Sequence, residues 1–234
     1  MPLDLARIRL ICFDVDGTLR DTDDQFVHSL EGWLRPARLL FRGRDARPFA
    51  RWLVMKSETP GSLLLGLPDR LGLDAPLARL GDLVYNLGLG KTETRFLIVK
   101  GVRAMLAALC LQYPLAVVSA RGERTTLAFL SQSGLQGYFQ QIVTGQTCRY
   151  TKPYPHPILY AAQSMGVAPE TVLMVGDTTV DIRAGKAAGA QTVGVLCGFG
   201  QEAELRREGA DLILPSTPDL LPALLDGRPA PSTG

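Results

Sequence analysis

The chain has 234 residues, of which 46% are hydrophobic and 21% charged, and this length can bury a sizeable core. Its net charge of +2 is too small to indicate a nucleic-acid partner, and no basic run with interleaved aromatic residues occurs. No apolar stretch approaches the roughly 20 residues of a membrane-spanning helix, so we expect no membrane partner.

The cysteines are scattered along the chain. Cys12, Cys110, Cys148 and Cys197 lack the paired spacing of zinc and redox motifs, so they are expected to be reduced thiols. Residues 1–9 show no secretory pattern. Together these observations indicate a cytoplasmic protein.

The first apolar run, residues 8–13, predicts a strand buried on both faces, as in a parallel sheet. Asp14 and Asp16 follow it directly in the segment DVDGT, at the strand end where open α/β sheets bind ligands. On an extended segment these carboxylates would point the same way and repel each other unless a cation or a phosphoryl group lies between them. The alternative is an ordinary turn, since Asp and Gly are favoured turn residues.

Residues 21–95 have a different pattern, without a convincing strand. Apolar residues recur there at helical spacing, for example Phe26, Leu30, Trp33 and Leu34. The pattern predicts a small all-helical cap inserted after the first strand. Arg44 and Arg47 lie on an expected interhelical loop and are candidates for binding an anionic group of a substrate, although such charges usually face solvent.

Beyond the insertion, strand-like runs alternate with helical patterns. The strands are expected at residues 114–119, 140–143, 171–175 and 191–196, and the helices at residues 101–112, 122–133, 156–165 and 179–188. This alternation predicts an α/β fold with a Rossmann-like, doubly wound parallel sheet. The core domain would comprise residues 1–20 and 96–226, followed by a flexible tail rich in Pro and Gly at residues 227–234.

Three further polar segments follow apolar runs or occupy a rigid loop. Ser119 comes at the end of the second expected strand, and Lys152 lies in a loop constrained by two prolines. Asp177 ends the fourth expected strand, and Asp181 falls in the first turn of the next helix. Asp181 has a second interpretation, as an ordinary helix-start acid stabilised by the helix dipole. Phosphoryl transfer to an aspartate requires a metal site, a cation near the phosphoryl oxygens, and hydroxyl or amide donors around them, and these segments offer all three kinds of residue.

In order, strand context and spacing, these segments resemble the four motifs of the haloacid dehalogenase superfamily, in particular its phosphoglycolate phosphatase-like subgroup with a helical cap. The corresponding residues are Asp14, Asp16 and Thr18 in the first motif, Ser119 in the second, Lys152 in the third, and Asp177 and Asp181 in the fourth. One departure is visible. Asn often follows the hydroxyl residue of the second motif, whereas Ala120 and Arg121 stand here, which leaves open what supplies the neighbouring contact.

The resemblance implies a Mg²⁺-dependent phosphatase that works through an aspartyl-phosphate. Asp14 would be the nucleophile and Asp16 the general acid and base. Mg²⁺ would be held by the Asp14 carboxylate, the Asp16 backbone carbonyl and Asp177, with Asp181 holding one of its waters. Ser119 and Lys152 would position the phosphoryl oxygens, and the remaining substrate contacts would come from Thr18, Ala120, Arg121, Arg44 and Arg47.

Several reactions fit these motifs. Dehalogenation is disfavoured, because a halide leaves without a proton and the acid Asp16 would have no role. A sugar-phosphate phosphomutase, a pyrophosphatase and a non-catalytic binding protein remain alternatives. The expected partner is a small phosphorylated metabolite such as phosphoglycolate, a sugar phosphate or a nucleoside monophosphate, bound by a monomer or homodimer.

Overall fold

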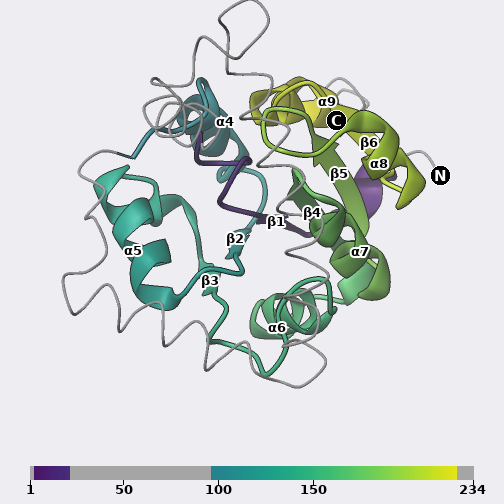
Figure 1. Cartoon of the computed structure of the whole chain (residues 1–234), viewed down its shortest axis with the longest axis horizontal. Coiled ribbons are helices and arrows are strands. Elements are labelled where there is room, and N and C mark those ends of the chain that lie inside the picture. The colour runs from purple at the N-terminus through teal and green to yellow at the C-terminus, as the bar shows by residue number, and fades with distance from the viewer. Residues whose placement is uncertain (1–2, 22–95, 226–234) are drawn as a thin grey trace, which may run out of the picture.

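The computed structural model describes residues 3–21 and 96–225, and these form one parallel sheet with helices on both faces (Figure 1). The sheet has six strands in the order β3-β2-β1-β4-β5-β6. Their bounds are Leu10–Phe13 for β1, Leu115–Val118 for β2, Gln141–Val143 for β3, Val172–Gly176 for β4, Gln191–Val195 for β5 and Leu212–Leu214 for β6. Each neighbouring pair is parallel, so all carboxyl ends lie at one edge of the sheet.

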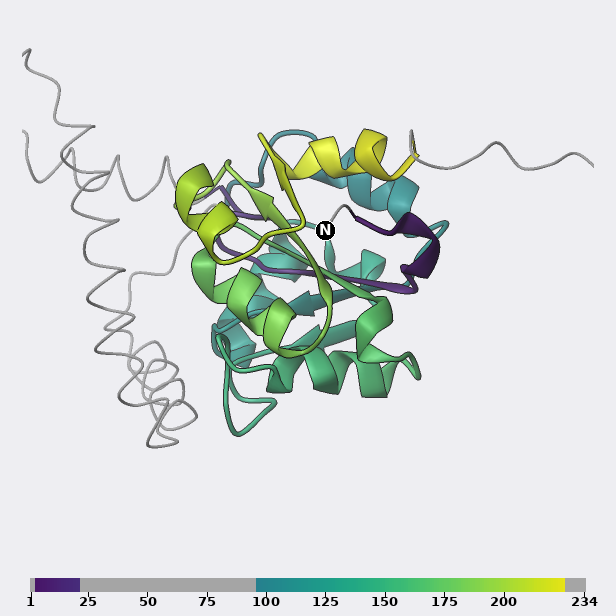
Figure 2. The same ribbon diagram turned by 90° about the vertical axis from the view of Figure 1, so that its right-hand side faces the viewer.

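Side-chain alternation along the strands produces a hydrophobic core on each face of the sheet. In β1, Ile11 and Phe13 belong to one core and Leu10 and Cys12 to the other. Figure 2 shows helices above and below the sheet. The first core is covered by α4 (Val102–Leu109), α5 (Glu123–Gln132) and α9 (Leu220–Leu225), and the second by α6 (His156–Ser164) and α7 (Thr179–Ala187).

The α/β class and the strands and helices predicted up to residue 196 are confirmed, with ends that differ by a few residues. The sequence analysis did not predict α8 (Glu202–Arg207), β6 or α9, which follow β5. Strand β6 has only three residues, all of them half-buried, so it lacks the continuous apolar run of a central strand. It forms because the exposed edge of β5 offers it hydrogen-bonding partners.

The described residues stop at Asp21 and resume at residue 96, and these two points lie side by side. The Asp21 amide donates to the Leu97 carbonyl at 3.0 Å, and Arg20 forms an antiparallel bridge with Ile98. The predicted cap, including Arg44 and Arg47, and the predicted tail lie outside the described residues. Among the helices that are described, none has the length and apolar character to cross a bilayer.

Candidate active site

Three of the predicted functional residues lie at the carboxyl edge of neighbouring strands. Asp14 follows β1, Ser119 follows β2 and Asp177 follows β4. Because β2, β1 and β4 are neighbours, three segments far apart in the sequence end at the same place. The Asp14 amide also continues the ladder by donating to the Val175 carbonyl at 2.9 Å, which fixes the backbone that carries its carboxylate.

Lys152 enters this edge from the loop before α6 and lies between two carboxylates. Its Nζ is 2.7 Å from Asp14 Oδ1 and 2.6 Å from Asp181 Oδ1, and its side chain is only 3% exposed. Burial by itself would lower the Lys152 pKa, but the attraction of Asp14 and Asp181 outweighs it and raises the pKa above its usual value. The lysine is therefore a permanent positive charge within the site.

Asp181 makes two kinds of contact, one with the start of α7 and one with Lys152. One oxygen, Oδ2, accepts from the Thr178 amide at 3.0 Å and from the Thr178 hydroxyl at 2.7 Å, which completes a capping box at the start of α7. The other oxygen accepts from Lys152. Asp181 thus caps the helix and at the same time contributes a buried carboxylate to the site.

The Asp177 carboxylate is closely surrounded by Thr18, Phe199 and two glycines. Its Oδ1 accepts from the Thr18 hydroxyl at 3.3 Å, and its Oδ2 accepts from the Phe199 amide at 2.9 Å. Gly17 has φ of 72°, and a Cβ there would lie 2.2 Å from Asp177 Oδ2, while a Cβ on Gly198 would lie 2.1 Å from the same atom. Only glycine fits at either position without displacing the carboxylate.

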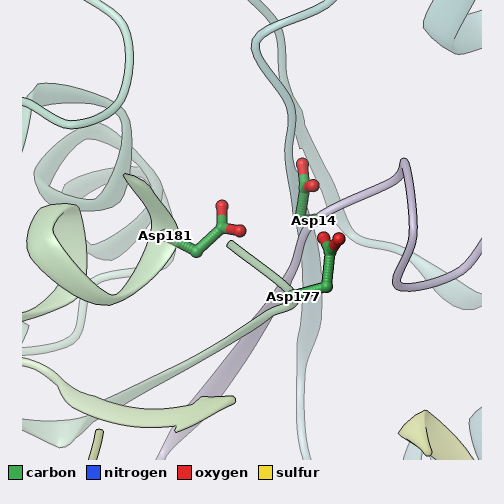
Figure 3. A group of neighbouring side chains, drawn as sticks. All are labelled: Asp14, Asp177 and Asp181. Atoms are coloured by element: carbon green, nitrogen blue, oxygen red, sulfur yellow. The ribbon is translucent and has the colours of Figure 1, made fainter. Parts of the chain in front are cut away.

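The carboxylates of Asp14, Asp177 and Asp181 form one group, with an oxygen from each lying within 4.8 Å of the others (Figure 3). Burial raises the pKa of Asp14 to about 7, a shift that Lys152 opposes and the neighbouring Asp181 and Asp16 reinforce. Three carboxylates around one ammonium group leave an excess of negative charge. Hard oxygen donors with that excess charge fit a divalent cation such as Mg²⁺.

Asp16 points to different partners from Asp14. Its Oδ2 accepts from Arg121 Nε, and its Oδ1 lies 3.5 Å from Arg20 Nη1. The alternation of an extended strand does not continue past Asp14, since the chain bends at Val15 and turns at Gly17. The two carboxylates therefore have different partners, and Asp16 does not belong to the three-carboxylate group.

The loop after β2 supplies the hydroxyl that the sequence predicted. Ser119 is 2% exposed, and its Oγ accepts from the Arg121 amide at 3.2 Å. Ala120 is exposed beside it. The Thr18 hydroxyl, predicted to contact substrate, donates to Asp177 Oδ1.

Sequence comparisons agree with this arrangement. A family model described as haloacid dehalogenase-like hydrolase matches residues 85–195. A phosphoglycolate phosphatase of Chromobacterium violaceum is 34% identical over 96% of this chain and 100% of its own length. A phosphoglycolate phosphatase of Shigella boydii is 36% identical over 93% of this chain and 92% of its own length. The chain belongs to the haloacid dehalogenase-like hydrolases.

Within the haloacid dehalogenase-like hydrolases this chain is an enzyme of the phosphatase type, as its motifs led us to expect. The fold agrees with that of solved hydrolase structures. A haloacid dehalogenase-like hydrolase of Streptococcus pneumoniae superimposes with a TM-score of 0.64 at 20% identity, covering 93% of this chain and 99% of the other. A hydrolase of Pseudomonas syringae gives 0.63 at 23% identity, covering 94% and 100%.

Sequence reasoning missed several residues of this haloacid dehalogenase-like site. Arg20 was not considered because it follows the first motif without an obvious role, and Phe199 contributes only its amide. The signal for Phe199 was present, since Gly198 and Gly200 flank it just beyond β5, and a Cβ on Gly200 would lie 1.8 Å from the Asp177 carbonyl oxygen. Such glycines at a strand exit indicate close backbone approach.

Proposed function

We propose that this protein is a Mg²⁺-dependent phosphatase that hydrolyses a small phosphomonoester through an aspartyl-phosphate on Asp14. One observation carries the proposal. Asp14 lies at the exit of β1, 2.7 Å from the Lys152 ammonium group and beside the carboxylates of Asp177 and Asp181. A nucleophilic carboxylate, a fixed cation and a group of hard oxygen donors therefore lie next to one another.

In the first step, an oxygen of Asp14 attacks phosphorus while the bond to the ester oxygen breaks, and Asp16 gives its proton to the departing oxygen. In the second step, Asp16 takes a proton from the water that attacks the aspartyl-phosphate, which restores both carboxyl groups. Lys152 and the Ser119 hydroxyl neutralise and orient the phosphoryl oxygens, where charge is largest in the transition state.

The residues present fit Mg²⁺, and we assign its ligands as the Asp14 carboxylate, the Asp16 backbone carbonyl and Asp177. Both oxygens of Asp181 already accept hydrogen bonds from Lys152 and Thr178, which supports an indirect role for it, through a water ligand. When bound, Mg²⁺ would stabilise negative charge on the phosphoryl group. The cradle of Gly17 and Gly198 keeps the Asp177 carboxylate in place for this purpose.

The substrate we propose is a small phosphorylated metabolite, with phosphoglycolate as the leading candidate, because both relatives described above are phosphoglycolate phosphatases. We further propose that the enzyme is cytoplasmic, since its four cysteines are all free thiols. We propose that the enzyme acts as a monomer or a homodimer, because the described site residues all come from one chain. Contacts from Arg44 and Arg47 remain part of the proposal.

Phosphate release tests the proposal directly. Wild type and Asp14→Asn would be assayed with Mg²⁺ on phosphoglycolate, sugar phosphates, nucleoside monophosphates and pyrophosphate. We expect one phosphomonoester to be preferred and Asp14→Asn to lower its turnover by about 10³-fold or more, as removal of a covalent nucleophile does. Glu208→Gln, on the exposed end of α8, is the control and should match wild type.

Three results would contradict the proposal. Full activity in Asp14→Asn would exclude Asp14 as the nucleophile. Release of phosphate from pyrophosphate alone would favour a pyrophosphatase. A requirement for a sugar bisphosphate in turnover, with isomerised sugar phosphate as the product, would favour a phosphomutase.

A further inference from the structure

Asp16 is held between two arginines from separate parts of the chain. Oδ1 faces Arg20, whose side chain is 3% exposed and whose guanidinium lies 5.0 Å from the centre of the Phe96 ring. Oδ2 accepts from Arg121, whose side chain is 30% exposed. The carboxylate thus has a buried arginine on one side and a solvent-accessible one on the other.

The backbone that carries Arg121 is fixed on the loop after β3. The Gly145 amide donates to the Arg121 carbonyl at 2.8 Å, and the Glu123 amide donates to Gln146 Oε1 at 3.0 Å. A Cβ on Gly145 would lie 2.5 Å from the Ala120 carbonyl oxygen, so the two loops pack closely. The position of Arg121 relative to Asp16 follows from this anchoring.

Only one of the donor groups of Arg121 is used by Asp16. A guanidinium has five N–H donors in a planar fork, and Nε makes the contact with Asp16. Within residues 3–21 and 96–225, the two terminal nitrogens of Arg121 make no hydrogen bond, and they belong to a partly exposed side chain. As far as the described residues are concerned, four N–H donors beside the acid and base are available to bind an anion.

We propose that Arg121 both positions Asp16 and selects phosphomonoesters whose leaving group carries an anion, such as a carboxylate, close to the ester oxygen. This inference rests on the proposed function. With phosphorus at Asp14 and the ester oxygen at Asp16, the leaving group continues past Asp16, where Arg121 lies. A guanidinium fork matches a carboxylate in geometry as well as in charge.

Paired substrates separate the two roles of Arg121. Phosphoglycolate and 2-hydroxyethyl phosphate have leaving groups of similar size, but only the first is anionic. For Arg121→Gln, we expect kcat to fall by about 10-fold with both substrates because Asp16 loses a partner, and KM to rise by a further factor of about 10 with phosphoglycolate alone. Arg121→Lys should recover part of the KM effect, since a lysine keeps the charge without the fork.

Arg207→Gln is the matched control, because Arg207 is an exposed arginine at the end of α8, away from the site. It should leave both substrates unaffected. Equal losses of kcat/KM on the two substrates in Arg121→Gln would overturn the selectivity role. Unchanged constants on both would overturn both roles of Arg121.

Ligand binding tests the inference without turnover, so its failure can be told from that of the proposed function. Wild type should bind 3-phosphonopropionate, in which a methylene replaces the ester oxygen of phosphoglycolate, about 10-fold more tightly than propylphosphonate in calorimetry with Mg²⁺. Arg121→Gln should abolish this preference. Equal affinities in wild type, or a preference that survives in Arg121→Gln, would overturn the selectivity of Arg121, whereas absence of phosphate release from any ester would overturn the proposed function alone.

Discussion

The ammonium group of Lys152 lies between two buried carboxylates, 2.7 Å from Asp14 Oδ1 and 2.6 Å from Asp181 Oδ1. Each of these charges would be costly to bury alone. Their arrangement is favourable only as a group, since Lys152 compensates Asp14 and Asp181 while Thr178 satisfies the remaining oxygen of Asp181. The residue that positions phosphoryl oxygens in the proposed mechanism is therefore also a structural residue.

Replacement of Lys152 tests this double role. In Lys152→Met, two buried carboxylates lose their cation, so we expect the free energy of unfolding to fall by about 3 kcal/mol at pH 8. We also expect phosphate release to fall by about 10²-fold or more. Urea unfolding monitored by circular dichroism measures the first effect. Lys100→Met, at an exposed turn, should change neither, and an unaltered urea midpoint in Lys152→Met would contradict the structural role.

At the scale of elements, Asp211 joins three parts of the second half of the fold. Its Oδ2 lies 2.5 Å from Lys186 Nζ on α7 and accepts from the Thr192 amide on β5 at 2.8 Å. Asp211 itself immediately precedes β6. Burial would raise the Asp211 pKa, but the hydrogen bonds from Lys186 and Thr192 outweigh it and lower the pKa below the usual value.

The lowered pKa of Asp211 predicts a pH-dependent contribution to stability. The folded protein holds the carboxylate more strongly ionised than the unfolded chain does, so the contribution is present above the unfolded pKa of about 4 and is lost as the pH falls through the folded pKa. Asp211→Asn should therefore lower the free energy of unfolding by about 1 to 3 kcal/mol between pH 5 and 8, and by less below about pH 4.

Thermal unfolding of both proteins across this pH range measures the difference. Glu202→Gln is a suitable control, because Glu202 pairs with Arg206 on the surface of α8 with its side chain 55% exposed. Such exposed pairs contribute little. A difference between wild type and Asp211→Asn that stayed constant from pH 8 to pH 3 would rule out the carboxylate as its source.

At the scale of the whole molecule, the parallel sheet brings together carboxylates that are up to more than 160 residues apart in the sequence. Asp14 and Asp177 come from adjacent strands, and Asp181 comes from the helix that follows β4 (Figure 3). The strands are held in register by their own buried apolar residues, so the carboxylates cannot move apart to relieve their repulsion. Binding of a divalent cation should relieve it.

Mg²⁺ should therefore stabilise the folded enzyme. At a concentration of Mg²⁺ about 100 times its Kd, linkage predicts a gain of about 2.7 kcal/mol in the free energy of unfolding, and a chelator should reverse the rise in Tm. Asp177→Asn should abolish the shift, whereas Asp211→Asn should retain it. An equal Mg²⁺-dependent rise in Tm in Asp177→Asn would place the cation elsewhere.

Five of the six described strands could be predicted from the sequence, together with the polar residues that follow three of them. Apolar runs identified β1 to β5, and the polar residue after each of β1, β2 and β4 identified Asp14, Ser119 and Asp177, because chain direction and burial are local properties of a parallel sheet.

Which groups pair across the site could not be predicted from the sequence. Arg121 and Asp16 are 105 residues apart, and no periodicity connects them. Their contact depends on β1 and β2 being neighbours and on the bend at Val15 and the turn at Gly17 that follow β1. Likewise, the Phe199 amide reaches Asp177 through the order of β4 and β5. Which side chains from distant segments pair depends on how those segments pack, and this packing cannot be read from a single sequence.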